Sequence, residues 1–163
     1  NDNSSIAKES DVLILSIQYE NIDSTCSQLL PEIKDSCIVI SPVVPMTKTD
    51  VGFEFIPIKE NKPFSYQLVS KYVKDKSKLV SAFHVISEKK LVNPTLELDY
   101  DIFVCGDDKE SVEVVNRLIN EIKGLRPIYL GPGELSYMAE ISTPLLLNAM
   151  IRNKIKNPGI KII

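Results

Sequence analysis

Glycine, histidine and cysteine are scarce in this chain, and each shortage excludes a class of site. There are only six glycines, and neither a GxGxxG nor a GxxxxGKS/T motif occurs, so the sequence carries no standard phosphate-binding loop. A single histidine, His84, excludes a metal centre built from several histidines. The three cysteines form no CxxC pair, which indicates neither a disulfide framework nor a zinc site. We expect reduced thiols in a cytoplasmic protein, and no metal.

Long apolar runs and a strong net charge are also missing. No stretch reaches the roughly 18 consecutive apolar residues of a membrane span. With 22 acidic and 19 basic residues the formal charge is −3, which argues against nucleic acid or an anionic membrane as the main partner. The first ten residues are polar and do not resemble a signal peptide. What remains is 163 residues, 44% of them hydrophobic, which are enough for a globular domain with a real core.

Short apolar runs alternate with amphipathic stretches along the chain. Five runs predict buried strands, at residues 11–17, 37–41, 79–83, 101–105 and 127–130. Helices are predicted at residues 20–34 (interrupted by Pro31), 63–75, 109–123 and 134–153 (with Pro144 as a possible kink). Residues 42–57 are predicted as a loop, and 84–98 as irregular. This alternation predicts an α/β fold with a mostly parallel sheet, and therefore a ligand site beyond the carboxyl ends of its strands.

A few residues near those strand ends have chemical potential, but each also has a structural interpretation. His84 could be a general acid/base or a ligand contact, although a hydrogen-bonded structural histidine is favoured. Asp107 and Asp108 resemble an acidic pair, yet their place before an amphipathic helix favours a helix cap. The sequence Gly131-Pro132-Gly133 favours a tight turn over a ligand cradle. The proline-rich stretch 41–45 could be one wall of a pocket for a flat ring, or a cover for the core.

Several motifs in a fixed order carry a family resemblance. They are Val39-Ile40-Ser41-Pro42-Val43-Val44-Pro45, Val80-Ser81-Ala82-Phe83-His84, Val104-Cys105-Gly106-Asp107-Asp108, Gly124-Leu125-Arg126-Pro127 and Glu140-Ile141-Ser142-Thr143-Pro144-Leu145-Leu146. From Asp11 onward the chain resembles the NADP-dependent reductases of the deazaflavin coenzyme F-420, also written F420. The resemblance implies a Rossmann-like domain over residues 1–130, a C-terminal helical lobe over 131–163, a homodimer and an archaeal or actinobacterial host.

The resemblance also implies an activity, a pair of cofactors and a set of contacts. It implies an oxidoreductase in which a hydride passes directly between NADP(H) and coenzyme F-420, so that no side chain need act as an acid or base. The apolar stretch that contains Ser41 and Pro42 would serve the stacking of two rings. The implied contacts with the nicotinamide are Leu15, Ser16, Ile17, Gln18 and Tyr19. The implied walls of the deazaflavin pocket are Val44, Pro45, His84, Glu88, Thr143 and Pro158.

The chain departs from the family pattern in two respects. The family's first βαβ unit, which holds the glycine-rich loop, has no counterpart, so we expect a fragment of a longer chain; if the chain were complete, dinucleotide binding would be lost. Gln18 stands where the family has proline, Ser87 and Glu88 replace small or apolar residues, and Tyr137 replaces a basic one. Two alternatives follow: a diverged reductase with another flavin-like or small-molecule acceptor, or a ligand-binding or dimerisation module without catalysis.

Overall fold

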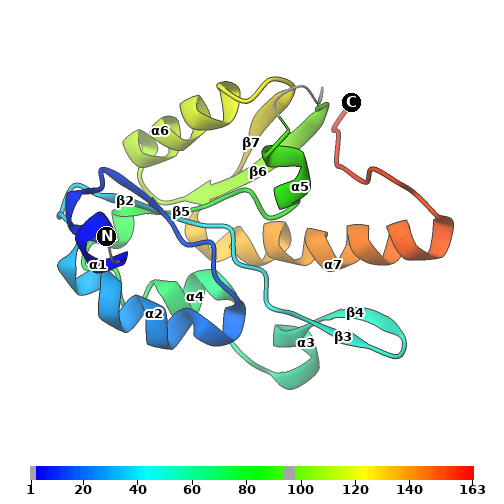
Figure 1. The fold of residues 1–163 in the computed structure, drawn as a ribbon, viewed down its shortest axis with the longest axis horizontal. Helices are drawn as coiled ribbons and strands as arrows, with labels where there is room; N and C mark the ends of the chain where they lie inside the picture. The colour runs from blue at the N-terminus through cyan, green and yellow to red at the C-terminus, as the bar shows by residue number, and fades with distance from the viewer. Residues whose placement is uncertain (1–2, 94–97) are drawn as a thin grey trace.

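A five-stranded sheet forms the centre of the molecule (Figure 1). The computed structural model describes residues 3–93 and 98–163, apart from the side chain of Glu88. The strands lie in the order β1-β2-β5-β6-β7, with bounds Val12–Ile14, Ile38–Ser41, Leu79–Ser81, Tyr100–Gly106 and Leu125–Gly131. The first three are parallel, β6 runs antiparallel to β5, and β7 is parallel to β6. The predicted α/β class with a mostly parallel sheet is confirmed.

Helices cover both faces of this sheet (Figure 1). One face carries α6 (Lys109–Asn120), and the other carries α2 (Ile22–Leu29), α4 (Ser65–Val69) and the long α7 (Ser136–Asn153). Short helices α1 (Asn3–Glu9), α3 (Ile56–Glu60) and α5 (Glu88–Leu91) complete the set, with 3₁₀ turns η1 (Tyr19–Asn21), η2 (Leu30–Glu32), η3 (Lys76–Lys78) and η4 (Gly133–Leu135). Two apolar clusters fill the spaces on either side, one including Val39 and Leu79 and the other Ile40 and Val80. Successive strand residues therefore face opposite cores, as expected for strands buried on both sides.

The helix predicted at residues 20–34 is present but is interrupted. It begins as the η1 turn, continues as α2 and ends in η2, which contains Pro31, as the proline predicts. The helix predicted at 63–75 is much shorter, because only Ser65–Val69 is helical. The Ser70 hydroxyl donates to the Gln67 carbonyl where that helix ends, and such local bonds compete with helix continuation.

The prediction of a loop over residues 42–57 is wrong. This segment contains a β-hairpin of β3 (Met46–Thr49) and β4 (Gly52–Phe55), paired antiparallel (Figure 1). Gly52 has φ of 128°, a backbone conformation that favours glycine, directly after the turn between the strands. The sequence did not predict these strands, because they are short and prolines lie before and after the hairpin. The irregular segment predicted at 84–98 likewise contains helix α5, and its residues 94–97 lie outside the described residues.

Helix α7 is fastened to α4 by a buried carboxylate. Glu140 is 1% exposed, and its two carboxylate oxygens accept hydrogen bonds from the backbone N–H groups of Ser65 (2.9 Å) and Tyr66 (3.0 Å). Burial raises the pKa of Glu140 to about 8, although these two bonds favour the charged form. Further along, Pro144 lies inside the helix. In the described residues, none of the helices has the length and apolar character needed to cross a lipid bilayer.

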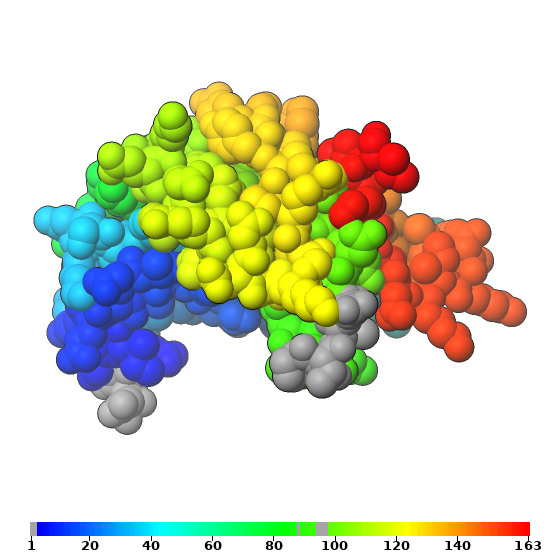
Figure 2. All heavy atoms as spheres, turned by 90° about the horizontal axis from the view of Figure 1, so that it is seen from above, coloured from blue at the N-terminus to red at the C-terminus, as the bar shows by residue number. Residues whose placement is uncertain are grey.

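After α7 the chain reverses and returns to the sheet. Lys154 takes a left-handed conformation (φ 55°), and the C-terminal segment then lies against the strands, as Figure 2 shows in red. The Asp101 N–H donates to the Ile160 carbonyl (2.7 Å), and the Asp101 carboxylate accepts from the Ile162 N–H (2.6 Å). Arg126 adds two bonds of 2.8 Å to the same carboxylate. The C-terminal segment can lie beside Asp101 because β5 pairs with Cys105 and Gly106, at the other end of β6, and leaves the edge of β6 near Asp101 unpaired by β5.

Candidate cofactor-binding site

The loops that follow β1, β2 and β5 surround a hollow of about 680 Å³. These three strands are parallel, so their carboxyl ends meet at one edge of the sheet, where ligands of such folds bind. Residues 16–20, 42–44, 83–84 and 86 line the hollow together with Thr143 of α7. We call it the first hollow. Its position agrees with the site that the strand pattern predicts.

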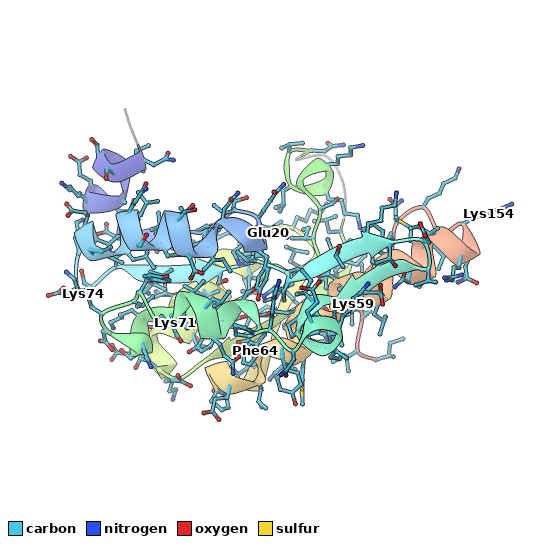
Figure 3. All side chains as sticks on the ribbon, turned by 90° about the horizontal axis from the view of Figure 1, so that it is seen from below. Glu20, Lys59, Phe64, Lys71, Lys74 and Lys154 are labelled. Atoms are coloured by element: carbon cyan, nitrogen blue, oxygen red, sulfur yellow. The ribbon has the colours of Figure 1, made fainter. Side chains whose placement is uncertain are left out.

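The β3–β4 hairpin supplies the outer wall of the first hollow through Met46, Thr47 and Lys48. An amide from α7 holds the hairpin in place: Asn148 Oδ1 accepts from the Phe53 N–H (2.8 Å) and its Nδ2 donates to the Phe53 carbonyl (2.6 Å). Opposite lies Glu20, which Figure 3 shows at the end of the helix that is nearest the hairpin. The first hollow therefore carries one lysine and one glutamate on apolar and hydroxyl walls.

A second hollow of about 460 Å³ adjoins the first. Three residues line both: His84, Ile86 and Thr143. The remainder of the lining comes from α7, α5, the loop before α5 and the C-terminal segment, as Val85, Ser87, Lys89, Lys90, Leu146, Leu147, Met150, Lys156, Asn157 and Pro158. It thus combines an apolar base with three lysines.

His84 lies at the junction of the two hollows and is firmly held. It is 7% exposed, its Nε2 lies 3.1 Å from the Ser81 Oγ, and its backbone carbonyl accepts from the Thr143 hydroxyl (2.7 Å). Burial lowers the pKa of His84 to about 3, and a hydrogen bond to the Ser41 backbone opposes this only in part. The imidazole is therefore neutral near pH 7, which fits the structural interpretation and a ligand contact but not a charged acid.

The residue before His84 has an unusual backbone. Phe83 has φ of 69°, in the left-handed region that residues with a side chain rarely occupy, at a cost of about 1–2 kcal/mol. It follows β5 and Ala82, lines the first hollow, and packs against the cluster that contains Ile40 and Val80. Phe83 and His84 both contribute to the lining of the hollow at this turn. Strain of this kind persists where the surroundings fix it, and here it lies at the mouth of the candidate site.

The structure brings most of the expected contact residues together. Those that line the first hollow are Ser16, Ile17, Gln18, Tyr19, Pro42, Val44, His84 and Thr143. Pro158 lines the second hollow.

Three other expected contacts do not line the first hollow, and a fourth, Glu88, has a side chain that the structure does not describe. Leu15 is buried in the core on the side of α2, and Ser41 is buried beneath the hollow, where its Oγ has no hydrogen-bond partner among the described residues. Pro45 is buried as well, and its carbonyl accepts from the Ile56 N–H (2.9 Å). Glu88 is the residue at which α5 begins.

The acidic pair after β6 acts structurally. Asp108 caps α6 by accepting from the Ser111 N–H (2.8 Å), which confirms the predicted cap. Asp107 accepts from the Tyr66 hydroxyl (3.1 Å) and from the Gly133 N–H (2.9 Å), and so joins three elements. Over residues 3–93 and 98–163 no group of three or more His, Cys, Asp and Glu side chains could hold a metal.

Sequence reasoning missed the hairpin wall and the lysines of the second hollow. Lys89 and Lys156 are 67 positions apart in the chain, so only the return of the C-terminal segment brings them to one cavity. The sequence contains a weak indication of the hairpin, because Thr, Phe and Met lie on either side of Gly52 in a pattern compatible with short strands.

Comparisons with known proteins identify relatives of this chain. No protein-family model matches the chain. An F420-dependent NADP reductase of Methanocaldococcus jannaschii is 39% identical over 161 residues, covering 99% of this chain and 71% of the relative. One from Methanothermobacter thermautotrophicus is 27% identical, covering 98% and 69%.

Among solved structures, the fold is similar to that of an Arthrobacter sp. FB24 protein described as a candidate F420-dependent NADP reductase. The TM-score is 0.76 at 15% identity, over 98% of this chain and 73% of that one. At this identity the likeness concerns the fold alone, whereas the relative at 39% identity establishes kinship. The chain belongs to the F420-dependent NADP reductase family.

Proposed function

We propose that this chain acts in an NADP-dependent oxidoreductase that passes a hydride between NADP(H) and coenzyme F-420. The observation that carries the proposal is the pair of adjoining hollows at the carboxyl ends of three parallel strands, joined at His84 and Thr143. A hydride donor and acceptor must meet within one enclosed space, and the shared lining provides a place for two rings to stack. Family membership supports the same reaction.

The walls suit flat, largely apolar rings. We assign the nicotinamide to residues 16–19 and the deazaflavin to Pro42, Val44, His84 and Thr143, with Pro158 in the second hollow. When both are bound, the nicotinamide of NADPH supplies a hydride to the deazaflavin ring, which also takes up a proton from solvent. Pro42 and the buried Val43 contribute apolar surface to the lining of the first hollow.

The chain's own contribution is orientation rather than proton transfer. Ser81 contacts the imidazole ring of His84, and Thr143 binds its backbone carbonyl. The neutral imidazole presents an uncharged surface to the nicotinamide and the deazaflavin. Correct placement of two reactants can account for several kcal/mol of a reaction barrier. We therefore assign no catalytic acid or base in this chain.

We further propose a homodimer in the cytoplasm of an archaeal cell, like the cells from which the relatives come. Helix α7 supports the dimer, because apolar side chains on it are exposed: Met138 is 46% exposed, Leu145 61% and Ile151 54%. Exposed apolar surface on one long helix is typical of a subunit interface. We assign residues 131–163, which contain α7 and the C-terminal segment, to the helical lobe and residues 1–130 to the Rossmann-like part.

The test is a spectroscopic assay on the full-length protein. NADPH is mixed with oxidised coenzyme F-420, the deazaflavin absorbance is followed, and flavin mononucleotide is assayed in parallel. Bleaching of coenzyme F-420 alone is expected. Bleaching only with flavin mononucleotide would assign the chain to a diverged reductase, and binding without any bleaching would assign a non-catalytic ligand-binding module.

A matched pair of variants links that activity to the site. Thr143→Val removes the bond to the His84 carbonyl while keeping the side-chain volume, and kcat is expected to fall roughly tenfold if orientation governs the rate. Thr25→Val, on α2 and away from both hollows, is the control and should leave kcat unchanged. If the two variants had equal kcat values, Thr143 would have no role in orienting the reactants.

A further inference from the structure

The described side chains of the second hollow include three lysines and no acid. Lys89 and Lys90 come from α5, and Lys156 comes from the C-terminal segment. The first hollow has one lysine and one glutamate, Lys48 and Glu20, whose charges balance. In a chain of net charge −3, the described side chains of the second hollow therefore concentrate positive charge.

The three lysines have different surroundings. The Lys90 ammonium donates to the Tyr100 hydroxyl (3.0 Å) and the Pro158 carbonyl (2.9 Å), and it lies 4.1 Å from the centre of the Tyr100 ring. It therefore fixes the C-terminal segment to α5. Lys89 and Lys156 are exposed. Their flexible side chains can reach an anion in the hollow, as lysines do when they act as point charges toward phosphate.

We propose that the second hollow is a subsite for the anionic tail of the deazaflavin, its phosphodiester and carboxylates, bound by Lys89 and Lys156. This proposal rests on the proposed function. A ring at the junction formed by His84, Ile86 and Thr143 has its polar extension directed either to solvent or into the adjoining hollow. The apolar base of Leu146, Leu147 and Met150 lowers the local dielectric, which strengthens the attraction of the lysines for the tail.

The experiment compares two acceptors with the full-length protein. One is coenzyme F-420 with its whole tail, and the other is the same deazaflavin ring with only the ribityl chain, which has no phosphate or carboxylate. Binding is measured by quenching of deazaflavin fluorescence, and turnover by absorbance. The double variant Lys89→Gln/Lys156→Gln is expected to raise Kd and KM for the tailed acceptor roughly tenfold, and to change the untailed one less than twofold.

The matched control is Lys71→Gln/Lys109→Gln, which removes two exposed lysines that line neither hollow. It should leave both acceptors unaffected. Raising the ionic strength should weaken binding of the tailed acceptor to the unmodified protein more than to the double variant.

Three outcomes would overturn the proposal: equal weakening of both acceptors, no change for either, or an equal effect of the control. Failure of the proposed function looks different, because then the unmodified protein would reduce neither acceptor with NADPH.

Discussion

The outer walls of the two hollows both consist of segments appended to the sheet, but they are held by different chemistry. The hairpin beside the first hollow is held by two side chains of α7: Asn148 makes two bonds to the Phe53 backbone, and Arg152 donates to the Val51 carbonyl. The C-terminal segment beside the second hollow is held by an ion pair, in which Arg126 fixes Asp101 and the Asp101 carboxylate binds Ile162. These contacts between α7 and the first wall therefore involve no carboxylate that acid could protonate, whereas the second wall depends on the carboxylate of Asp101.

This difference indicates which substitutions should disturb one hollow and which should disturb both. Both walls depend on α7, which carries Asn148 and leads into the C-terminal segment, and Glu140 fastens that helix to α4. A change at Glu140 should therefore disturb both hollows, whereas changes at Arg126 or Asn148 should each disturb one. The predictions below separate these cases.

Glu140→Ala has the largest expected effect, a loss of about 3 kcal/mol in the free energy of unfolding. The N–H groups of Ser65 and Tyr66 lose their acceptor in a buried place, and each such loss costs about 1–3 kcal/mol. Chemical denaturation measures the change, and the exposed Glu113→Ala on α6 is the control. A loss no greater than in the control would contradict the role of Glu140 as a fastener.

The pH dependence of the same site tests its protonation. The pKa of Glu140 is raised to about 8, above the usual value near 4.3, so the folded chain retains a proton that the unfolded chain has released. Stability should therefore fall as the pH rises from about 4 to 8. Glu140→Gln should remove that part of the fall, and an unchanged slope would show that the carboxylate is already charged at low pH.

Arg126→Ala should cost about 2 kcal/mol, because the buried Asp101 carboxylate loses two charge-assisted bonds while Arg126 itself is 48% exposed. The pKa of Asp101 is lowered chiefly by its bonds to Arg126, so this stabilisation is complete above about pH 4 and is lost as the pH falls through the lower, folded pKa. The difference between variant and unmodified protein should vanish in that acidic range.

For Arg126→Ala the matched control is Arg117→Ala, at an exposed position on α6, with an expected change below about 0.5 kcal/mol. Limited proteolysis followed by mass spectrometry should show faster cleavage in residues 154–163 of the Arg126 variant only. If the hairpin were cleaved first, the proposal that Arg126 holds only the C-terminal segment would be wrong.

Asn148→Ala has the smallest expected effect, about 1 kcal/mol, because the two bonds to Phe53 are only partly buried. In the reductase assay it should raise the KM for the reactants several-fold while keeping the ratio between tailed and untailed acceptors. Asn120→Ala, exposed at the end of α6, is the control. A changed ratio would mean that the hairpin also shapes the second hollow.

The sequence predicted the strands and the sheet edge well because those features are local. Runs such as Ile38–Ser41 are apolar over their whole length, and the Asp108 cap lies next to the helix that it begins. The hairpin was not predicted, because its strands have four residues each and prolines flank them. The second hollow depends on contacts such as Lys90 with Pro158, which no local pattern encodes.

The candidate site was predictable in part, for the same reason. Loop residues at strand ends, such as Gln18 and Val44, line the first hollow as the family motifs imply. Leu15 and Pro45 occupy the same loops but are buried, since side chains alternate in direction along an extended backbone. A motif match therefore predicts which loop lies at the site, whereas the direction of each side chain in that loop depends on the packing around it.

Pro144 divides helix α7 into two halves, for which we expect different rates of amide hydrogen exchange. Its ring nitrogen carries no hydrogen, so the carbonyl four residues earlier, that of Glu140, lacks its usual partner in the helix. The half before Pro144 is held by the buried carboxylate contact with α4, whereas the half after it, which bears the base of the second hollow, is held by partly exposed bonds to the hairpin. Amide hydrogens after Pro144 should therefore exchange with deuterium sooner than those before it, and cofactor bound in the second hollow should slow only the later group.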